Sequence, residues 1–214
     1  MRTKWTKDSL IEYEGKLAKM FEEGKINCPL HLCGGNEQEL LSIFSQVQEK
    51  DWVFSTHRAH YHYLLKGGVE EKLTAEVLGG ADGMCGGVGR SMHLYDKSIN
   101  FYTSAIVAGN VAMAVGVAMA IKQTSNQVDR NNWPHVWCFV GDGAEDSGWF
   151  VEAVRLANGR ELPITFIVED NDFSIDVDKK TRWHNYSPVD SVGVIRYHYE
   201  REWPHVGIGK MVMF

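Results

Sequence analysis

The chain has 214 residues, 44% of them hydrophobic and 23% charged, which is the composition of a soluble protein with a buried core. At this length we expect one domain over residues 1–214. The net charge of −6 argues against nonspecific nucleic-acid binding, which needs a basic surface. The four cysteines lack metal-binding or disulfide spacing, and we recognise no signal peptide or membrane-spanning segment, so we expect a reduced, cytoplasmic location.

The first part of the chain contains segments with helical and strand patterns. Over residues 9–23, apolar residues recur at helical spacing with charged residues between them. The same spacing predicts helices over 37–49, 61–66 and 70–78. A short apolar run over 51–56 predicts a strand that separates the second helix from the third.

Two segments that contain glycine are expected to be irregular. Residues 28–36 form a turn-rich link between the first two helices. Residues 79–93 hold six glycines in fifteen positions, which predicts a loop whose backbone comes close to another group.

The run over 104–123 is rich in alanine, glycine and methionine, and it predicts a buried helix packed tightly against a neighbour.

The second part of the chain has the pattern of a βαβ unit. A short apolar run over 135–140 predicts a buried strand, and a glycine-containing turn follows at 141–143. Apolar spacing predicts a helix over 147–158, and residues 163–168 predict a second buried strand. An acidic turn comes next. This order indicates an α/β fold with a parallel sheet flanked by helices.

Polar residues follow both strands of this unit. Asp142 and Asn171 each come just after the carboxyl end of a strand, where parallel sheets bind ligands. The oxygen atoms of these side chains, with the carbonyl of Phe173, are the donors that Mg²⁺ prefers. The backbone N–H groups of Gly143 and Ala144 lie at a helix start, which favours a phosphate. Alternatively, the same residues form an ordinary turn and a capping amide.

Several motifs resemble those of a known family. The sequence from Gly141-Asp142-Gly143 to Glu169-Asp170-Asn171 resembles the thiamin-diphosphate motif that begins with GDG and ends with NN. The segments STHRAHYHYLLKG, GGVGRSMHLYD and AIVAGNVAMAVGVAMA resemble those of the alpha subunits of decarboxylating 2-oxo-acid dehydrogenases of the pyruvate dehydrogenase kind. The resemblance covers residues 28–178 and implies a thiamin-diphosphate-binding fold, with thiamin diphosphate and Mg²⁺ as cofactors.

The resemblance also implies roles for the histidines and for one arginine. Arg58 would contact the cofactor diphosphate, because a planar guanidinium suits two phosphate oxygens. His57 stands where the family usually has tyrosine. His60 would lie near the reacting carbon, and His93 would help to shape the mouth of the active site. Near the C-terminus, either His198 or His205 would serve the site, with His205 as our choice.

Backbone groups complete the implied cofactor site. The resemblance places Ala105 and Val107 against the aminopyrimidine ring of the cofactor, with Ile106 beneath it. The family has glycine in place of Ala105, which is a small departure that a backbone contact tolerates. Gly141 would join Gly143 and Ala144 beside the diphosphate.

The implied function is the oxidative decarboxylation of a pyruvate-like 2-oxo acid. In the family, a glutamate that activates the cofactor comes from a pyrimidine-binding domain on a beta chain, and the usual assembly is a heterotetramer. We therefore expect a beta subunit as partner, with a lipoyl-bearing acyltransferase as a further partner. The segment NDFSID also resembles transketolase, so one alternative is the N-terminal half of a split transketolase. The other is a non-catalytic subunit that binds the cofactor.

Overall fold

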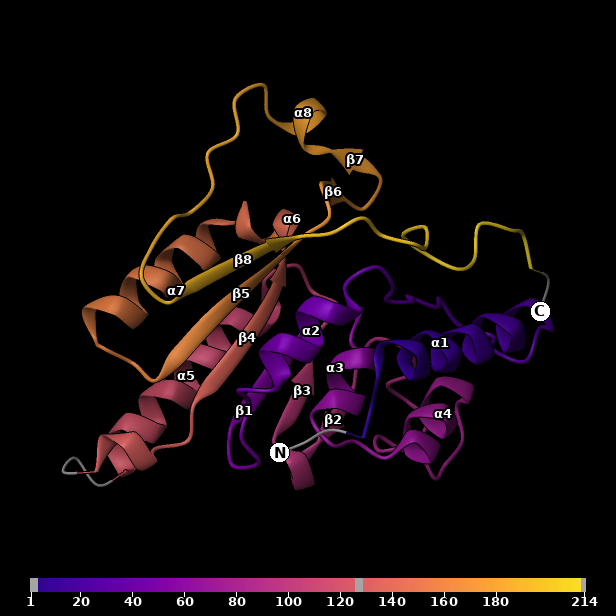
Figure 1. Cartoon of the computed structure of the whole chain (residues 1–214), viewed down its shortest axis with the longest axis horizontal. Helices are drawn as coiled ribbons and strands as arrows, with labels where there is room; N and C mark the ends of the chain where they lie inside the picture. The colour runs from indigo at the N-terminus through magenta and orange to yellow at the C-terminus, as the bar shows by residue number, and fades with distance from the viewer. Residues whose placement is uncertain (1–3, 126–128, 213–214) are drawn as a thin grey trace.

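The computed structural model describes residues 4–125 and 129–212, and this part of the chain contains a six-stranded sheet (Figure 1). Its strand order is β2-β3-β1-β4-β5-β8, in which β2 is antiparallel to β3 and the other neighbours are parallel. The predicted α/β fold with a mostly parallel sheet is thus confirmed. The strands are β1 Trp52–Ser55, β2 Tyr95–Asp96, β3 Phe101–Thr103, β4 Val136–Gly141, β5 Ile164–Asp170 and β8 Val194–His198, and a separate hairpin pairs β6 Phe173–Ser174 with β7 Val177–Asp178.

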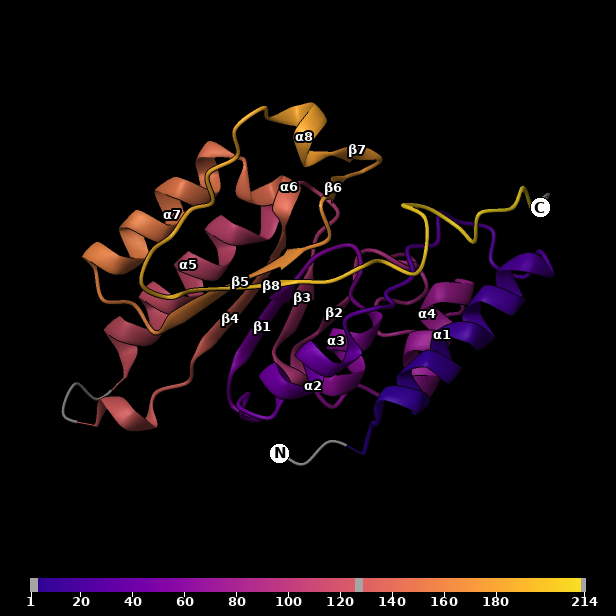
Figure 2. The ribbon, with the colours of Figure 1, turned by 45° about the horizontal axis from the view of Figure 1, so that its top comes forward.

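Helices cover both faces of the sheet, as Figure 2 shows. One face packs against α5 and α7, and the other faces α1 to α4. Within the described residues, no helix is long and apolar enough to cross a membrane. The helices are α1 Lys7–Glu22, α2 Glu37–Phe44, α3 His60–Leu65, α4 Glu70–Leu78, α5 Gly109–Thr124, α6 Asp142–Glu145, α7 Gly148–Gly159 and α8 Lys179–Arg182, with short 3₁₀ helices at Lys97–Ile99 and Arg130–Asn132.

The central strand β4 explains why both faces need a cover. Side chains alternate between the two faces of a strand. Cys138 and Val140 are buried with α5 and α7, whereas Trp137 and Phe139 are buried with α1 to α4. Because both sets are apolar, the strand shows as a continuous apolar run in the sequence. The predicted βαβ unit, β4-α7-β5, is present with its strands parallel.

One helix prediction agrees with the structure at both ends, and another overruns the helix that the structure contains. The bounds of α4 agree with the prediction over 70–78, but the helix predicted over 37–49 ends at Phe44. The hydroxyl of Ser45 donates to the carbonyl of Ser42 at 2.7 Å, a local bond that competes with helix continuation. Val47 is nevertheless buried, so its apolar character reflects packing after the helix has ended.

The glycine-rich loop over 79–93 wraps around a buried carboxylate. Glu76 accepts hydrogen bonds from the backbone N–H groups of Cys85 and Gly87 at 2.7 and 3.0 Å, and from those of Gly89 and Arg90 at 2.7 and 3.2 Å. A Cβ atom at Gly83 would lie 2.3 Å from an oxygen of the same carboxylate. The expected close approach is therefore present, and the group approached belongs to the chain itself.

Candidate functional site

A cavity of about 320 Å³ lies at the carboxyl edge of the parallel strands. Strands β1, β4 and β5 all end beside it, which is where open α/β sheets bind ligands. Segments distant in sequence complete its wall. The lining residues are His31, Cys33, Asn36, Thr56, His57, Arg58, Met92, Ser104, Ala105, Ile106, Val107, Ala108, Asn110, Val140, Gly141, Asp142, Gly143, Ala144, Glu169, Asn171, Phe173, Ser174, Ile175, Tyr199, Arg201 and His205.

Asp142, predicted as a metal ligand, lines this cavity and is only 1% exposed. Its Oδ2 atom accepts a hydrogen bond from Nη2 of Arg182 at 2.9 Å, and Nζ of Lys179 lies 3.9 Å away. Burial raises the pKa of the Asp142 carboxyl to about 6, although both cations oppose the shift. A buried carboxylate with cations beside it is thus a place where a metal ion can also be held.

Asn171 and Phe173, the two other predicted metal donors, line the same cavity. The amide oxygen of Asn171 accepts a hydrogen bond from the backbone N–H of Phe173 at 3.0 Å, and its amide nitrogen donates to the hydroxyl of Tyr199 at 3.1 Å. Carboxylate, amide and carbonyl oxygens are the hard donors that Mg²⁺ prefers. The residues present at this edge thus fit a Mg²⁺ ion.

The turn after β4 approaches the β6–β7 hairpin closely. A Cβ atom at position 143 would lie 2.5 Å from Oγ of Ser174 and 2.8 Å from its Cβ, so a side chain larger than that of glycine requires the hairpin to move. Gly141, Gly143 and Ala144 all line the cavity. The glycine turn therefore presents backbone rather than side chain to a ligand, as phosphate binding requires.

Residues before α5 form an apolar rim around the cavity. Ala105, Ile106 and Val107 all line it, and the last two are each 64% exposed. Ala108, which follows, has a φ of 55°, a left-handed conformation that is unfavourable for a residue with a Cβ. Exposed apolar side chains and local backbone strain are both typical of binding sites.

Arg58 lines the cavity, but most of its guanidinium is turned toward backbone. Its Nη1 atom donates to the carbonyl of Leu32, and its Nη2 atom donates to the carbonyls of Pro204 and His205 at 3.2 and 3.1 Å. These bonds tie the C-terminal segment to the loop after β1. Arg58 therefore builds the wall of the cavity and supplies a positive charge to it.

His205 lines the cavity, whereas His60 and His93 do not. Helix α3 turns the side chain of His60 toward α1, where Nδ1 lies 2.8 Å from Oε1 of Glu14 and Nε2 lies 3.0 Å from Oγ of Ser91. His60 is fully buried, and His93 is exposed away from the cavity. The structure thus brings neither His60 nor His93 into the lining of the cavity, and their predicted roles at the reacting carbon and at the mouth stay predictions.

The two histidines near the C-terminus are also distinguished by the structure. His198 is exposed at the end of β8, and its Nδ1 atom lies 3.8 Å from Oδ1 of Asp170. His205 belongs to the segment that Arg58 holds against the cavity. Of the two, His205 is therefore the one positioned to meet a ligand.

Several polar lining residues were not selected from the sequence. His31, Cys33 and Asn36 come from the link over 28–36, which shows turn residues but no catalytic motif. Glu169 is 5% exposed, and its Oε1 atom accepts a hydrogen bond from Nδ2 of Asn36 at 3.2 Å. The position of Glu169 two residues before Asn171, at the end of a buried strand, is the signal that identifies it.

Comparison with known proteins now assigns the chain to a family. The profile of the family described as "Dehydrogenase E1 component" matches residues 7–195, and this span contains all three predicted metal donors. The chain belongs to the dehydrogenase E1 component family. The resemblance found in the sequence motifs is thereby confirmed.

Curated relatives agree with this assignment. The chain is 33% identical over 194 residues to the alpha subunit of acetoin:2,6-dichlorophenolindophenol oxidoreductase from Bacillus subtilis, a match that covers 88% of this chain and 55% of that protein. It is also 33% identical over 165 residues to the alpha subunit of the pyruvate dehydrogenase E1 component from Porphyra purpurea, covering 76% of this chain and 48% of that protein. The chain thus spans about half the length of the curated relatives it matches.

A solved structure supports the fold. Transketolase from Leishmania mexicana superposes with a TM-score of 0.58 at 18% sequence identity, over 84% of this chain and 29% of that one. At this identity the likeness concerns the fold alone. It agrees with the predicted architecture of a mostly parallel sheet between helical layers.

Proposed function

We propose that the chain binds thiamin diphosphate together with Mg²⁺, as the diphosphate-binding part of an enzyme that oxidatively decarboxylates a pyruvate-like 2-oxo acid. The convergence of Asp142, Asn171 and Phe173 on one cavity, in a member of the dehydrogenase E1 component family, carries this proposal. The names of two relatives, which refer to pyruvate dehydrogenase and to an acetoin oxidoreductase, support it. The proposal treats residues 1–214 as one domain.

The residues of the glycine turn would hold the charged end of the cofactor. Asp142, Asn171 and the carbonyl of Phe173 would bind Mg²⁺, and the backbone of residues 141–144 would face the diphosphate. Arg58 would add a positive charge near these phosphates. Because three of its hydrogen bonds already go to backbone carbonyls, we expect Arg58 to act mainly through that charge.

The remaining lining would orient the other end of the cofactor. Ala105, Ile106 and Val107 form the apolar rim on which the ring system would lie. When bound, thiamin diphosphate supplies the electron sink that makes decarboxylation of a 2-oxo acid feasible. His57 and His205 both line the cavity, and we assign them to the region where substrate would enter. His60 would act through packing, since it has no contact with the cavity.

A partner chain belongs to the proposal. Both relatives described above are named as alpha subunits, which supports a beta subunit as partner. We propose that this beta subunit brings the pyrimidine-binding domain and the activating glutamate, in a heterotetramer, and that a lipoyl-bearing acyltransferase accepts the acyl group. The exposed Ile106 and Val107 would then lie at the junction of the two chains. A cytoplasmic location is part of the same proposal.

Calorimetric titration of the chain with thiamin diphosphate tests the central claim. We expect heat of binding with Mg²⁺ and none after chelation, and at least tenfold weaker binding in Asp142→Ala. Asp190→Ala, which removes an exposed carboxylate, is the matched control and should bind like the wild type. Binding that ignores Mg²⁺ or the Asp142→Ala change contradicts the proposal, as does an absence of binding at millimolar cofactor by the chain reconstituted with its beta subunit.

The substrate class needs a separate assay. With a reconstituted beta subunit, release of CO₂ from pyruvate supports the dehydrogenase function. Transfer of a two-carbon unit between sugar phosphates would instead favour the split transketolase. A cofactor-bound complex without either activity would favour the non-catalytic subunit.

A further inference from the structure

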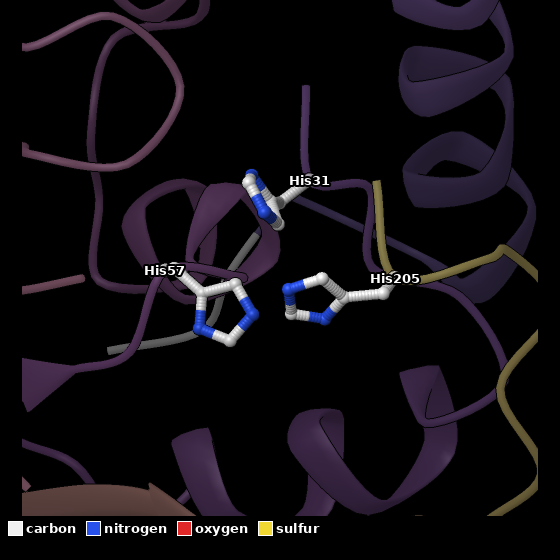
Figure 3. A group of neighbouring side chains, drawn as sticks. All are labelled: His31, His57 and His205. Atoms are coloured by element: carbon white, nitrogen blue, oxygen red, sulfur yellow. The ribbon is translucent and has the colours of Figure 1, made fainter. Parts of the chain in front are cut away.

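Three histidines from distant segments face one another in the cavity wall. His31 comes from the link before α2, His57 from the loop after β1 and His205 from the segment after β8. Figure 3 shows the three imidazole rings turned toward a common space. One ring nitrogen from each residue lies within 4.8 Å of those of the other two. The ring centroids are 4.8, 5.1 and 5.3 Å apart.

Two of these rings have nitrogens that lack a partner. Nδ1 of His31 and Nε2 of His57 are buried and make no hydrogen bond. A buried polar atom without a hydrogen-bond partner is costly, and native proteins contain few of them. A ligand that binds ring nitrogens would remove this cost. The two unpaired atoms are therefore available to a ligand.

The chemistry of three imidazole side chains grouped together identifies the kind of ligand. Burial, with a further contribution from Arg58, lowers the pKa of His31 to about 3 and the pKa of His57 well below its usual value. The same causes lower the pKa of His205. These shifts favour the uncharged form of the imidazole, in which one ring nitrogen carries no proton. Neutral imidazole is the form of histidine that binds metal ions.

We propose that His31, His57 and His205 form a binding site for a divalent transition-metal ion of the zinc class, separate from the Mg²⁺ position at Asp142. Imidazole nitrogens favour zinc and its neighbours in the transition series, whereas the oxygen donors around Asp142 favour Mg²⁺. The two sets of donor atoms therefore prefer different metal ions although they line the same cavity. The inference rests on the histidines alone and does not depend on thiamin diphosphate.

With three protein ligands, a four-coordinate ion has one position left for a ligand that the chain does not supply. All three histidines line the cavity, so this position faces the space where a small molecule would enter. Open sites of this kind hold water or a substrate oxygen at the fourth position. The ion would therefore lie where the carboxylate or carbonyl oxygen of a small organic acid can reach it.

Binding requires a small adjustment of the cluster. Zinc–nitrogen bonds of about 2.0–2.1 Å place tetrahedral ligand atoms roughly 3.4 Å apart. The nitrogens, which lie up to 4.8 Å apart, must therefore approach one another by up to about 1.4 Å. His205 lies outside the helices and strands of the described chain, so its segment is the one that we expect to move. The charge of Arg58 opposes a second cation. Its guanidinium, however, points to the carbonyls of Leu32, Pro204 and His205 rather than into the cluster.

Titration of the whole chain with Co²⁺, without thiamin diphosphate, tests the site. Co²⁺ replaces zinc and gives visible absorption bands whose intensity reports four-coordinate geometry. We expect one equivalent to bind, Zn²⁺ to displace it stoichiometrically, and millimolar Mg²⁺ to leave it in place. If the wild type gives no such bands at neutral pH, or if Mg²⁺ displaces Co²⁺ as readily as Zn²⁺ does, the proposal is wrong.

Variants then assign the ligands. His31→Ala, His57→Ala and His205→Ala should each weaken Co²⁺ binding at least tenfold, whereas His184→Ala, which removes an exposed histidine outside the cavity, should not change it. Zn²⁺ should raise the midpoint of thermal unfolding of the wild type and of His184→Ala only. Where an alanine variant fails to fold, the glutamine variant replaces it. Unchanged binding in two of the three ligand variants would overturn the assignment.

Discussion

The glycine-rich loop depends on one carboxylate, which makes Glu76→Gln an informative substitution. Glu76 is fully buried, and its two oxygens accept four backbone N–H groups of the loop over 79–93. Glutamine has the same size, but one oxygen becomes an NH₂ group. That group then faces two N–H donors and can accept neither.

The expected loss of stability follows from these bonds. A hydrogen bond to a charged acceptor contributes about 1.5–3 kcal/mol, and at least two such bonds disappear. Because water does not reach a fully buried side chain, the two N–H groups that face the new NH₂ group have no other hydrogen-bond acceptor. We therefore expect Glu76→Gln to lower the free energy of unfolding by about 3–5 kcal/mol.

Urea unfolding followed by circular dichroism measures this difference. The matched control is Glu152→Gln, which changes an exposed side chain of α7 and should stay within about 0.5 kcal/mol of the wild type. If Glu76→Gln also unfolds within about 0.5 kcal/mol of the wild type, the carboxylate does not hold the loop and the reasoning fails.

Three further substitutions test other parts of the structure by urea unfolding without metal. Burial raises the pKa of Asp142 from 3.8 to about 6, so the folded chain holds this proton more tightly than the unfolded chain does. The free energy of unfolding of the wild type should therefore fall by on the order of 3 kcal/mol as the pH rises from about 4 to about 6. Asp142→Asn should not show this fall. Ala108→Gly should stabilise the chain by about 0.5–1 kcal/mol, because glycine adopts a left-handed φ freely; a loss would contradict the strain. His60→Ala should destabilise by about 3 kcal/mol, because Glu14 loses its buried partner; an unchanged midpoint would refute this.

Much of the fold could be predicted because strand and helix patterns are local. The apolar run of β4 and the helical spacing of α7 establish the βαβ unit without any tertiary information. The end of α2 could not be predicted in the same way. Val47 continues the apolar spacing because it packs in the core, while a hydroxyl bond from Ser45 has already ended the helix.

The metal-binding edge was predictable, but the histidines were not. Asp142 and Asn171 follow parallel strands, and the ends of such strands meet at one edge. Helix α3 offers no such guide, because all six of its residues are buried and periodicity cannot tell which side His60 faces. The position of His205 depends on a hydrogen bond between residues 147 positions apart, which no local pattern records.

The bonds from Arg58 to the carbonyls of Pro204 and His205 also affect how the protein is made. A nascent chain folds from its N-terminus, so β1 and the arginine that follows it leave the ribosome long before their acceptors do. Until synthesis reaches residue 205, this guanidinium has water in place of two of its carbonyl partners. The wall of the cavity is thus completed only after the strands that it joins have been made, and a chain that stops before residue 204 leaves Arg58 without these two partners.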